Sequence, residues 1–232
     1  MDGPFLERIT KLLCCVLPLV AAGCADFGGP RWSMNQRPQA DQLAHIPTPA
    51  AKISVLQKLA DRAGWASEKD KQAVVTGLCG AIQTEEDPLI RAEIVSTLGE
   101  YACPATDPVM YRALEDKEAE VRLAACEALG KRGGRQAAEK LADKLQVDKN
   151  VDVRLAAARA LGHSKEQLAV TALGEALEDK DPAMQYRAVL SLREVTGEDF
   201  DNDVNRWRQY VSGEHPRPAK PISIAERFRQ LF

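Results

Sequence analysis

The chain has 232 residues, of which 45% are hydrophobic and only 5% aromatic. This is enough apolar material for a core, but it consists mostly of Ala, Leu and Val, which lets helices pack closely without large rings. The formal net charge of −3 at pH 7 argues against a general nucleic-acid binder, because such a protein needs a basic surface.

Residues 1–23 have the pattern of a secretory signal peptide. Arg8 and Lys11 precede an almost unbroken apolar run, Leu12 to Ala22, which is too short to span a bilayer as a stable helix. The run ends in Ala22-Gly23-Cys24, which resembles the lipobox of bacterial lipoproteins. The resemblance implies cleavage just before Cys24 and a diacylglycerol on its thiol, with the new amino terminus usually acylated. We therefore expect a lipid anchor on Cys24; the alternative is an ordinary signal peptide that is cut nearby.

Residues 24–49 are rich in glycine and proline and show little apolar periodicity. This composition is typical of a flexible tether, which would hold the folded part of the chain away from the membrane.

A repeat of 31 or 32 residues organises residues 50–196. Asp116–Gly130 and Asp148–Gly162 are its clearest copies, and both contain a segment that begins with Val-Arg and ends with Ala-Leu-Gly. Weaker copies begin at Glu85 and Asp179. A fixed period of this size predicts a solenoid of helical hairpins, each of which buries its apolar face against its neighbours.

Capping residues and apolar stripes predict the helices of each hairpin. The first helices are predicted to begin after N-caps at Asp87, Asn150 and Asp181, and we expect glycines to end them in a left-handed conformation. Those glycines are Gly99, Gly130 and Gly162. The second helices are predicted at about 104–115, 134–146 and 165–178, the last of them capped by Ser164. The first hairpin begins near Ala50, and its second helix opens at Ser67.

The segments Val121–Gly130 and Val153–Gly162 resemble the HEAT-like repeat typified by phycobilin-lyase subunits, and the resemblance covers roughly residues 50–195. It implies an all-α fold, a HEAT-like α-solenoid that forms a right-handed superhelix of about five helical hairpins. Function is less constrained, because this repeat serves scaffolding, chaperone-like docking and, in the lyase branch, chromophore attachment.

Three arginines recur at one phase of the repeat: Arg91, Arg122 and Arg154. In a solenoid, such a line of guanidinium groups can clamp anions or acidic segments. The structural alternative, which we favour, is that each arginine bonds a loop carboxylate of an adjacent repeat. The candidate carboxylates are Asp116, Asp148 and Asp179.

Other residues with chemical potential show no catalytic or metal-binding spacing. Cys79, Cys103 and Cys126 are predicted to be buried thiols, although an exported protein could form one disulfide from them. Alternating aspartates at 199, 201 and 203 favour a turn and a helix cap over a calcium loop. We expect no cofactor and no small-molecule substrate.

The end of the chain has two parts. Residues 197–213 are predicted to form a capping helix, with Trp207 covering the open end of the stack. Residues 214–232 are predicted to be a Pro-rich basic tail with a short amphipathic helix from Ile222 onward. This tail either lies on an anionic membrane or packs back onto the repeats, and the second interpretation is slightly favoured.

The leading functional prediction is a membrane-anchored, non-enzymatic HEAT-repeat lipoprotein that binds or scaffolds a protein partner in the bacterial cell envelope, facing the periplasm or exterior. The candidate recognition residues are exposed positions of the second helices: Asp107, Tyr111, Arg112, Arg135, Glu139 and Lys140. A subunit of a chromophore-lyase-like enzyme is the alternative, disfavoured because those lyases act on cytoplasmic antenna proteins. A purely structural envelope component is a third hypothesis.

Overall fold

The structure is a computed structural model that describes residues 48–101 and 103–216. The predicted signal peptide, Cys24, almost all of the tether and most of the basic tail lie outside the described residues.

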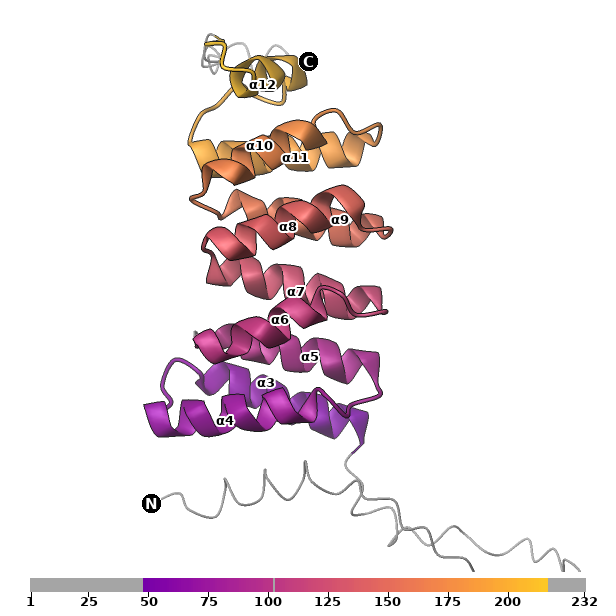
Figure 1. Cartoon of the computed structure of the whole chain (residues 1–232), viewed down its shortest axis with the longest axis vertical. Coiled ribbons are helices and arrows are strands. Elements are labelled where there is room, and N and C mark those ends of the chain that lie inside the picture. Colours follow the sequence, from indigo (N-terminus) through magenta and orange to yellow (C-terminus); the bar gives the residue numbers. More distant parts are fainter. Residues whose placement is uncertain (1–47, 102, 217–232) are drawn as a thin grey trace, which may run out of the picture.

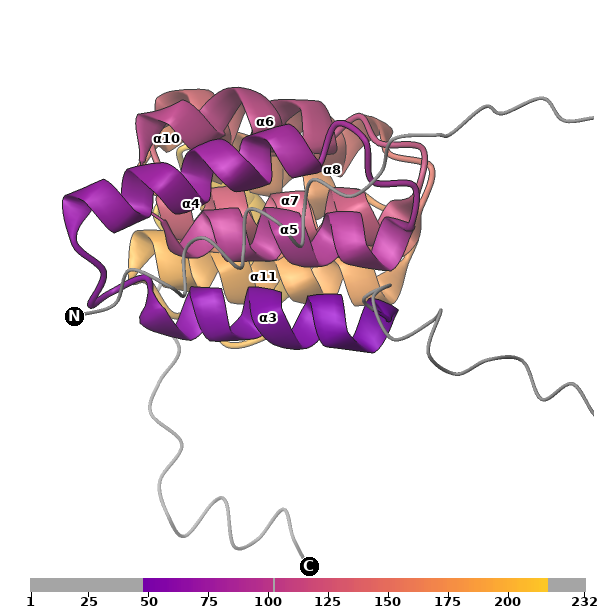
Figure 2. The same cartoon turned by 90° about the horizontal axis from the view of Figure 1, so that it is seen from below.

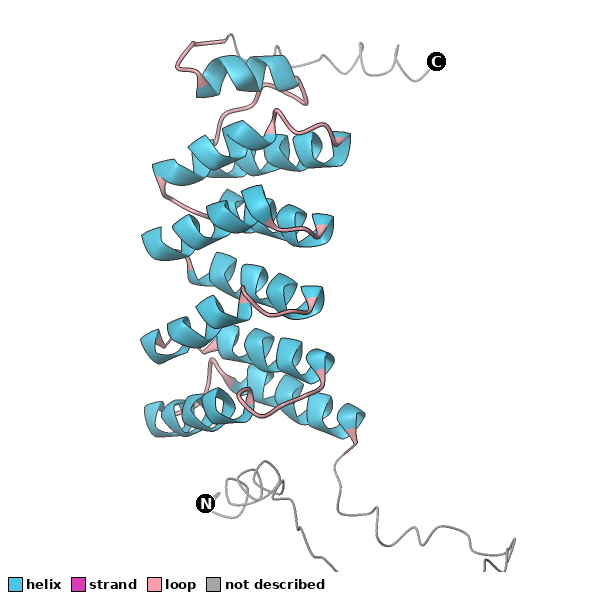
Figure 3. Ribbon diagram, turned by 45° about the vertical axis from the view of Figure 1, so that its right-hand side comes forward, coloured by secondary structure: helices cyan, strands magenta, loops and turns pink. Residues whose placement is uncertain are grey.

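The described residues form a stack of helical hairpins (Figure 1), and this part of the chain contains ten α-helices and no β-strand (Figure 3). The elements are α3 (Pro49–Arg62), α4 (Glu68–Ala81), α5 (Pro88–Glu100), the 3-10 helix η1 (Pro104–Thr106), α6 (Asp107–Ala113), α7 (Ala119–Arg132), α8 (Arg135–Val147), α9 (Val151–Gly162), α10 (Gln167–Ala176), α11 (Pro182–Thr196) and α12 (Val204–Val211). The all-α solenoid predicted from the period is therefore confirmed.

The helices of the stack lie in two layers, as the view along its axis shows (Figure 2). The first helices of the hairpins, α3, α5, α7, α9 and α11, each contact the next in one layer. The second helices α8 and α10 contact each other in the other layer, and α12 contacts both α10 and α11 at the end of the stack. A chain folded this way exposes one long row of second helices.

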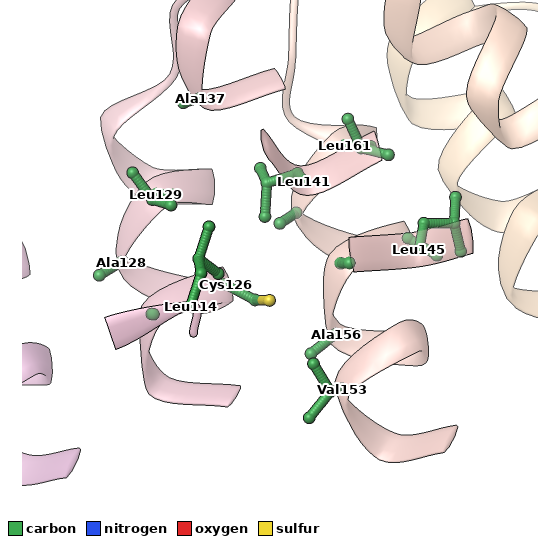
Figure 4. Close-up of a cluster of buried hydrophobic side chains, with 14 of the residues drawn as sticks. Leu114, Cys126, Ala128, Leu129, Ala137, Leu141, Leu145, Val153, Ala156 and Leu161 are labelled. Atoms are coloured by element: carbon green, nitrogen blue, oxygen red, sulfur yellow. The ribbon is translucent and has the colours of Figure 1, made fainter. Parts of the chain in front are cut away.

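The core between the layers consists of aliphatic side chains of moderate size. Between α7, α8 and α9 it contains Leu129, Leu141 and Leu161, which are at most 1% exposed, together with Cys126 (Figure 4). Burial of each leucine contributes about 1.5–3 kcal/mol. Small residues between them bring the helices close together, as the composition predicts.

The glycines near the ends of the first helices have a different role from the predicted one. Gly99, Gly130 and Gly162 lie inside their helices, and positive φ angles occur instead at other glycines, including Gly133 and Gly197. A Cβ on Gly130 would lie 2.8 Å from the Cβ of Ala160 and 3.0 Å from its Cα, both in the next first helix. These glycines are required for close approach between helices rather than for left-handed turns.

The predicted helix starts are correct at most of the caps. Asp87, Asn150 and Asp181 accept hydrogen bonds from the first backbone N–H groups of α5, α9 and α11, and Ser67 does so for α4. The start of α10 was predicted too early: the helix begins at Gln167, and Ser164 bonds only the N–H of Glu166, at 3.2 Å. The helix predicted at about 104–115 is divided into η1 and α6, with Pro104 and Pro108 at their starts.

The end of the stack is covered by α12. Trp207 is fully buried, forms edge-to-face contacts with Phe200 and Tyr210, and donates from Nε1 to the carbonyl of Asp201 at 3.2 Å. Arg208 donates from Nη2 to the carbonyl of Leu177 at 2.7 Å, at the carboxyl end of α10. The amphipathic segment therefore packs as its apolar stripe predicts.

Candidate functional site

A ladder of arginine–aspartate pairs joins successive hairpins on one edge of the stack. Arg91 donates from Nε and Nη2 to the carboxylate of Asp116 at 3.0 and 2.9 Å, and Arg122 donates in the same way to Asp148 at 2.7 and 2.8 Å. Nη1 of each arginine also bonds carbonyls at the turn before its own helix. Each side chain thus ties together two neighbouring loops, which is the structural role that we favoured.

The ladder also sets the ionisation of its carboxylates. Burial alone would raise the pKa of Asp148, but the hydrogen bonds from Arg122 and from the backbone N–H of Asn150 outweigh burial and lower it. The same balance of burial, Arg91 and the N–H of Glu118 lowers the pKa of Asp116. Both groups are therefore held as carboxylates in the folded protein.

Arg154 is the exception, and the prediction of a carboxylate partner for it is wrong. It donates one hydrogen bond, from Nη1 to the carbonyl of Asp148 at 3.2 Å, and within the described residues it forms no ion pair with Asp179. Arg91 and Arg122 are buried, whereas Arg154 is half-buried at the edge of a cavity of about 270 Å³. Contact with water there weakens the attraction that would hold it against a carboxylate.

The six predicted recognition residues do not form one site. Asp107 is paired with Arg132 at 3.1 Å beside Tyr111, whose pKa is raised by burial and by the charge of Asp107. Arg112 is exposed and lines a separate cavity of about 240 Å³ between α4 and α6. The pair of Asp107 and Arg132 stabilises the contact between α6 and α7, because Arg132 belongs to α7.

The other three candidates lie on α8 and are exposed. Arg135 donates from Nε to Glu139 at 3.0 Å, one helical turn away, and Lys140 makes no ion pair within the described residues. Glu139 also borders the space between α8 and α10.

The space between α8 and α10 forms two adjoining hollows of about 200 and 270 Å³, which share Gln146, Ala172 and Glu175. We call it the α8–α10 groove. Its lining residues are Glu139, Ala142, Asp143, Leu145, Gln146, Arg154, Leu168, Thr171, Ala172, Glu175, Ala176, Glu178 and Asp179. It runs along α10 and carries five carboxylates against one basic side chain.

The three described cysteines are free thiols. Cys126 is fully buried, and burial raises its pKa to about 12, so it is not a reactive thiolate at neutral pH. Cys79 and Cys103 are half-buried, which is less than the full burial expected of them, and burial also raises the pKa of Cys79.

Residues 48–101 and 103–216 contain no group of three or more His, Cys, Asp or Glu side chains that could hold a metal ion. Asp199 accepts from the N–H of Asp201, and Asp203 caps α12. None of the described helices combines the length and apolar character needed to cross a membrane.

Two overlapping segments of the chain, residues 75–149 and 138–203, match the family model for HEAT repeats. The chain belongs to the HEAT-repeat family. The matched segments cover more than half of the chain and include the whole arginine–aspartate ladder. HEAT repeats mark it as a protein-interaction or scaffold module. A comparison with curated proteins found no match.

The groove carboxylates on α10 and just after it could not be predicted from the sequence. Asp143 follows Glu139 by one helical turn, so the acidic face of α8 is visible in the sequence. The matching carboxylates Glu175 and Glu178 lie about one repeat away, and only the stacking of α10 on α8 brings them to the same groove.

Proposed function

We propose that this chain is a membrane-anchored HEAT-repeat lipoprotein that binds or scaffolds another protein in the bacterial cell envelope. The observation that carries the proposal is the HEAT-repeat match over a stack whose second helices expose charged side chains. Such stacks bind partners along an extended surface, because each repeat adds a similar face beside the previous one. The proposed role is non-enzymatic.

The location rests on the amino-terminal pattern. An apolar run of signal-peptide length followed by Ala22-Gly23-Cys24 supports export and lipidation of Cys24. Two or three acyl chains hold a protein on a membrane stably, whereas one chain is marginal. We therefore place the repeats in the cell envelope, tethered to a membrane and facing the periplasm or exterior.

The anchor is tested by fractionation and intact-mass measurement of the wild-type chain, Cys24→Ala and, as a matched control, Cys79→Ala. We expect Cys24→Ala to move the protein from the membrane fraction to the soluble fraction and Cys79→Ala to leave it on the membrane. A mature wild-type chain without added lipid mass would refute the anchor.

Partner binding is tested by crosslinking in intact membranes, followed by purification of the chain under denaturing conditions. We expect one crosslinked protein to dominate and to be lost when Glu139→Lys and Lys140→Glu are combined, two exposed positions on α8. A pattern with no dominant partner would refute specific binding while leaving the anchor result intact.

A further inference from the structure

We propose that the α8–α10 groove binds the C-terminal segment of this same chain, residues 222–232. The proposal does not depend on the protein partner or on the lipid anchor. It rests on the shape and charge of the groove, on the composition of the segment, and on the place where the described chain ends.

The floor of the groove is apolar. Ala142, Ala172 and Ala176 line it and are 4–8% exposed, so small side chains form much of the contact between α8 and α10 there. Leu168 borders one end and is 38% exposed, which is unusual for a leucine in this fold. A floor of alanines leaves room for larger apolar side chains from outside.

Three of the five carboxylates in the groove carry negative charge that no ion pair in the described residues neutralises. Asp143, Glu175 and Asp179 have no basic side chain within ion-pair distance in residues 48–101 and 103–216. Glu175 accepts a hydrogen bond from neutral Gln146. A ligand for this groove must therefore combine cationic groups with apolar side chains.

The end of this chain has that composition. Residues 217–232 contain four Lys or Arg residues, at positions 217, 220, 227 and 229, and one acidic residue, Glu226. Ile224, Phe228 and Leu231 follow one another at intervals of four and three, which places them on one side if the segment is helical. Three apolar side chains on one face and arginines beside them complement the alanine floor and its carboxylates.

The described chain ends close enough for this contact. Gly213, Glu214 and His215 line a cavity of about 390 Å³ together with Lys165 and Gln167, so the chain leaves the stack beside the start of α10. Residues 217–221 can span up to about 17 Å when extended. This exceeds the diameter of a helix, about 10–12 Å.

The length of the segment also fits the groove. As a helix, residues 222–232 would measure about 16 Å, and the ten residues of α10 measure about 15 Å. A segment that enters at Leu168 would place Arg227 and Arg229 toward Glu175 and Asp179 at the far end. A second copy of the chain, a basic partner protein and an anionic membrane are the competing occupants.

The test uses the full-length chain with a photo-crosslinking phenylalanine analogue in place of Phe228. After irradiation, mass spectrometry of the digested protein identifies the attachment sites, and mixed heavy- and light-isotope chains separate contacts within one chain from contacts between chains. We expect crosslinks within one chain to residues 139–146 and 168–176, with a yield independent of protein concentration.

Charge reversal tests the groove itself. Asp143→Lys combined with Glu175→Lys should lower the yield of crosslinks within one chain about fivefold. A larger loss is not expected, because each exposed ion pair contributes only modestly to binding. Asp61→Lys combined with Glu127→Lys changes the net charge equally at exposed positions outside the groove and should leave the yield unchanged. Crosslinks to α12 or between chains would overturn the proposal. An absence of crosslinks, or crosslinks that need anionic phosphatidylglycerol vesicles, would overturn it too.

Discussion

Arg122 and Asp148 lie 26 positions apart in the sequence and form a two-bond ion pair, with both side chains at most 5% exposed. Arg154 occupies the same repeat position one period later but reaches only a backbone carbonyl. The same residue type at equivalent positions thus has two environments, which allows the contribution of the carboxylate contact to be isolated.

Arg122→Ala is expected to destabilise the protein much more than Arg154→Ala. Removing Arg122 leaves the buried carboxylate of Asp148 without its partner, which typically costs about 3–5 kcal/mol. Arg154→Ala loses one hydrogen bond at a half-buried position, about 1 kcal/mol. Urea unfolding monitored by circular dichroism gives the free energy of unfolding of both variants.

Arg154→Gln provides the matched control. Gln185 occupies the equivalent position of the next hairpin and bonds the carbonyl of Asp179 at 2.7 Å, so glutamine can replace the contact that Arg154 makes. We expect Arg154→Gln to be nearly neutral and Arg122→Gln to remain strongly destabilising. Equal losses of stability in Arg154→Gln and Arg122→Gln would contradict the conclusion that Arg122, unlike Arg154, is held by a carboxylate.

The pH dependence of the free energy of unfolding should also reveal how much the arginine–aspartate ladder stabilises the protein. The folded-state pKa values of Asp116 and Asp148 are lowered from 3.8, so the stabilisation they contribute is fully present above the unfolded-state pKa. It is lost as pH falls from about 4 through the folded-state pKa values, because protonation then removes the ion pairs.

The measurement is the free energy of unfolding between pH 5 and about 2 for the wild-type chain and for Asp116→Asn. Asparagine cannot ionise, so the variant should be less stable at pH 5 and should lose less stability on acidification. Parallel curves for the two proteins would exclude a contribution from Asp116.

The sequence predicts the stack well because the period, the N-caps and the apolar stripes are local patterns that all require the same hairpin. The role of Gly130 could not be read in this way, because a glycine near a helix end is compatible with both a left-handed cap and a close helix contact. Only the position of Ala160 in the neighbouring helix distinguishes the two.

The α8–α10 groove could not be predicted from the sequence either, for a geometrical reason. Asp143 and Glu175 are about one repeat apart, and nothing in either local sequence indicates that they border the same hollow. Arg154 shows the opposite case: the repeat predicts a carboxylate partner, but at the edge of the groove the side chain bonds only the backbone carbonyl of Asp148.

Gly130→Ala is expected to destabilise the protein by about 1–3 kcal/mol, because its Cβ would lie too close to backbone and side-chain atoms of Ala160. Gly77→Ala is the control: it is exposed on α4, and an added Cβ there would meet nothing within 4 Å. That substitution should stabilise the protein by about 0.5–1 kcal/mol through higher helix propensity. Thermal unfolding of both variants tests the sign, and a shift in the same direction for both would contradict the close-contact role.

Trp207 and Trp65 give a matched comparison of a buried and an exposed tryptophan. Trp207 of α12 is fully buried, whereas Trp65 is 90% exposed in the turn between α3 and α4. Trp207→Ala should destabilise the protein by about 3–5 kcal/mol, as expected when a large buried ring is removed. Trp65→Ala should change the stability by less than about 0.5 kcal/mol.

Two truncations then separate α12 from the tail beyond it. A chain ending at Gly213 retains Trp207 and its contacts with Phe200 and Tyr210, so it should still unfold cooperatively. A chain ending at Gly197 exposes the apolar surface of α10 and α11 that α12 covers, including the face of Gly174 that meets Val211. Because solenoids need a polar-faced terminal unit, we expect this shorter chain to aggregate, which light scattering during thermal unfolding detects. Equal scattering from the two truncated chains would show that α12 is not the cap, whereas loss of folding in the chain ending at Gly213 would show that the residues after it belong to the stable stack.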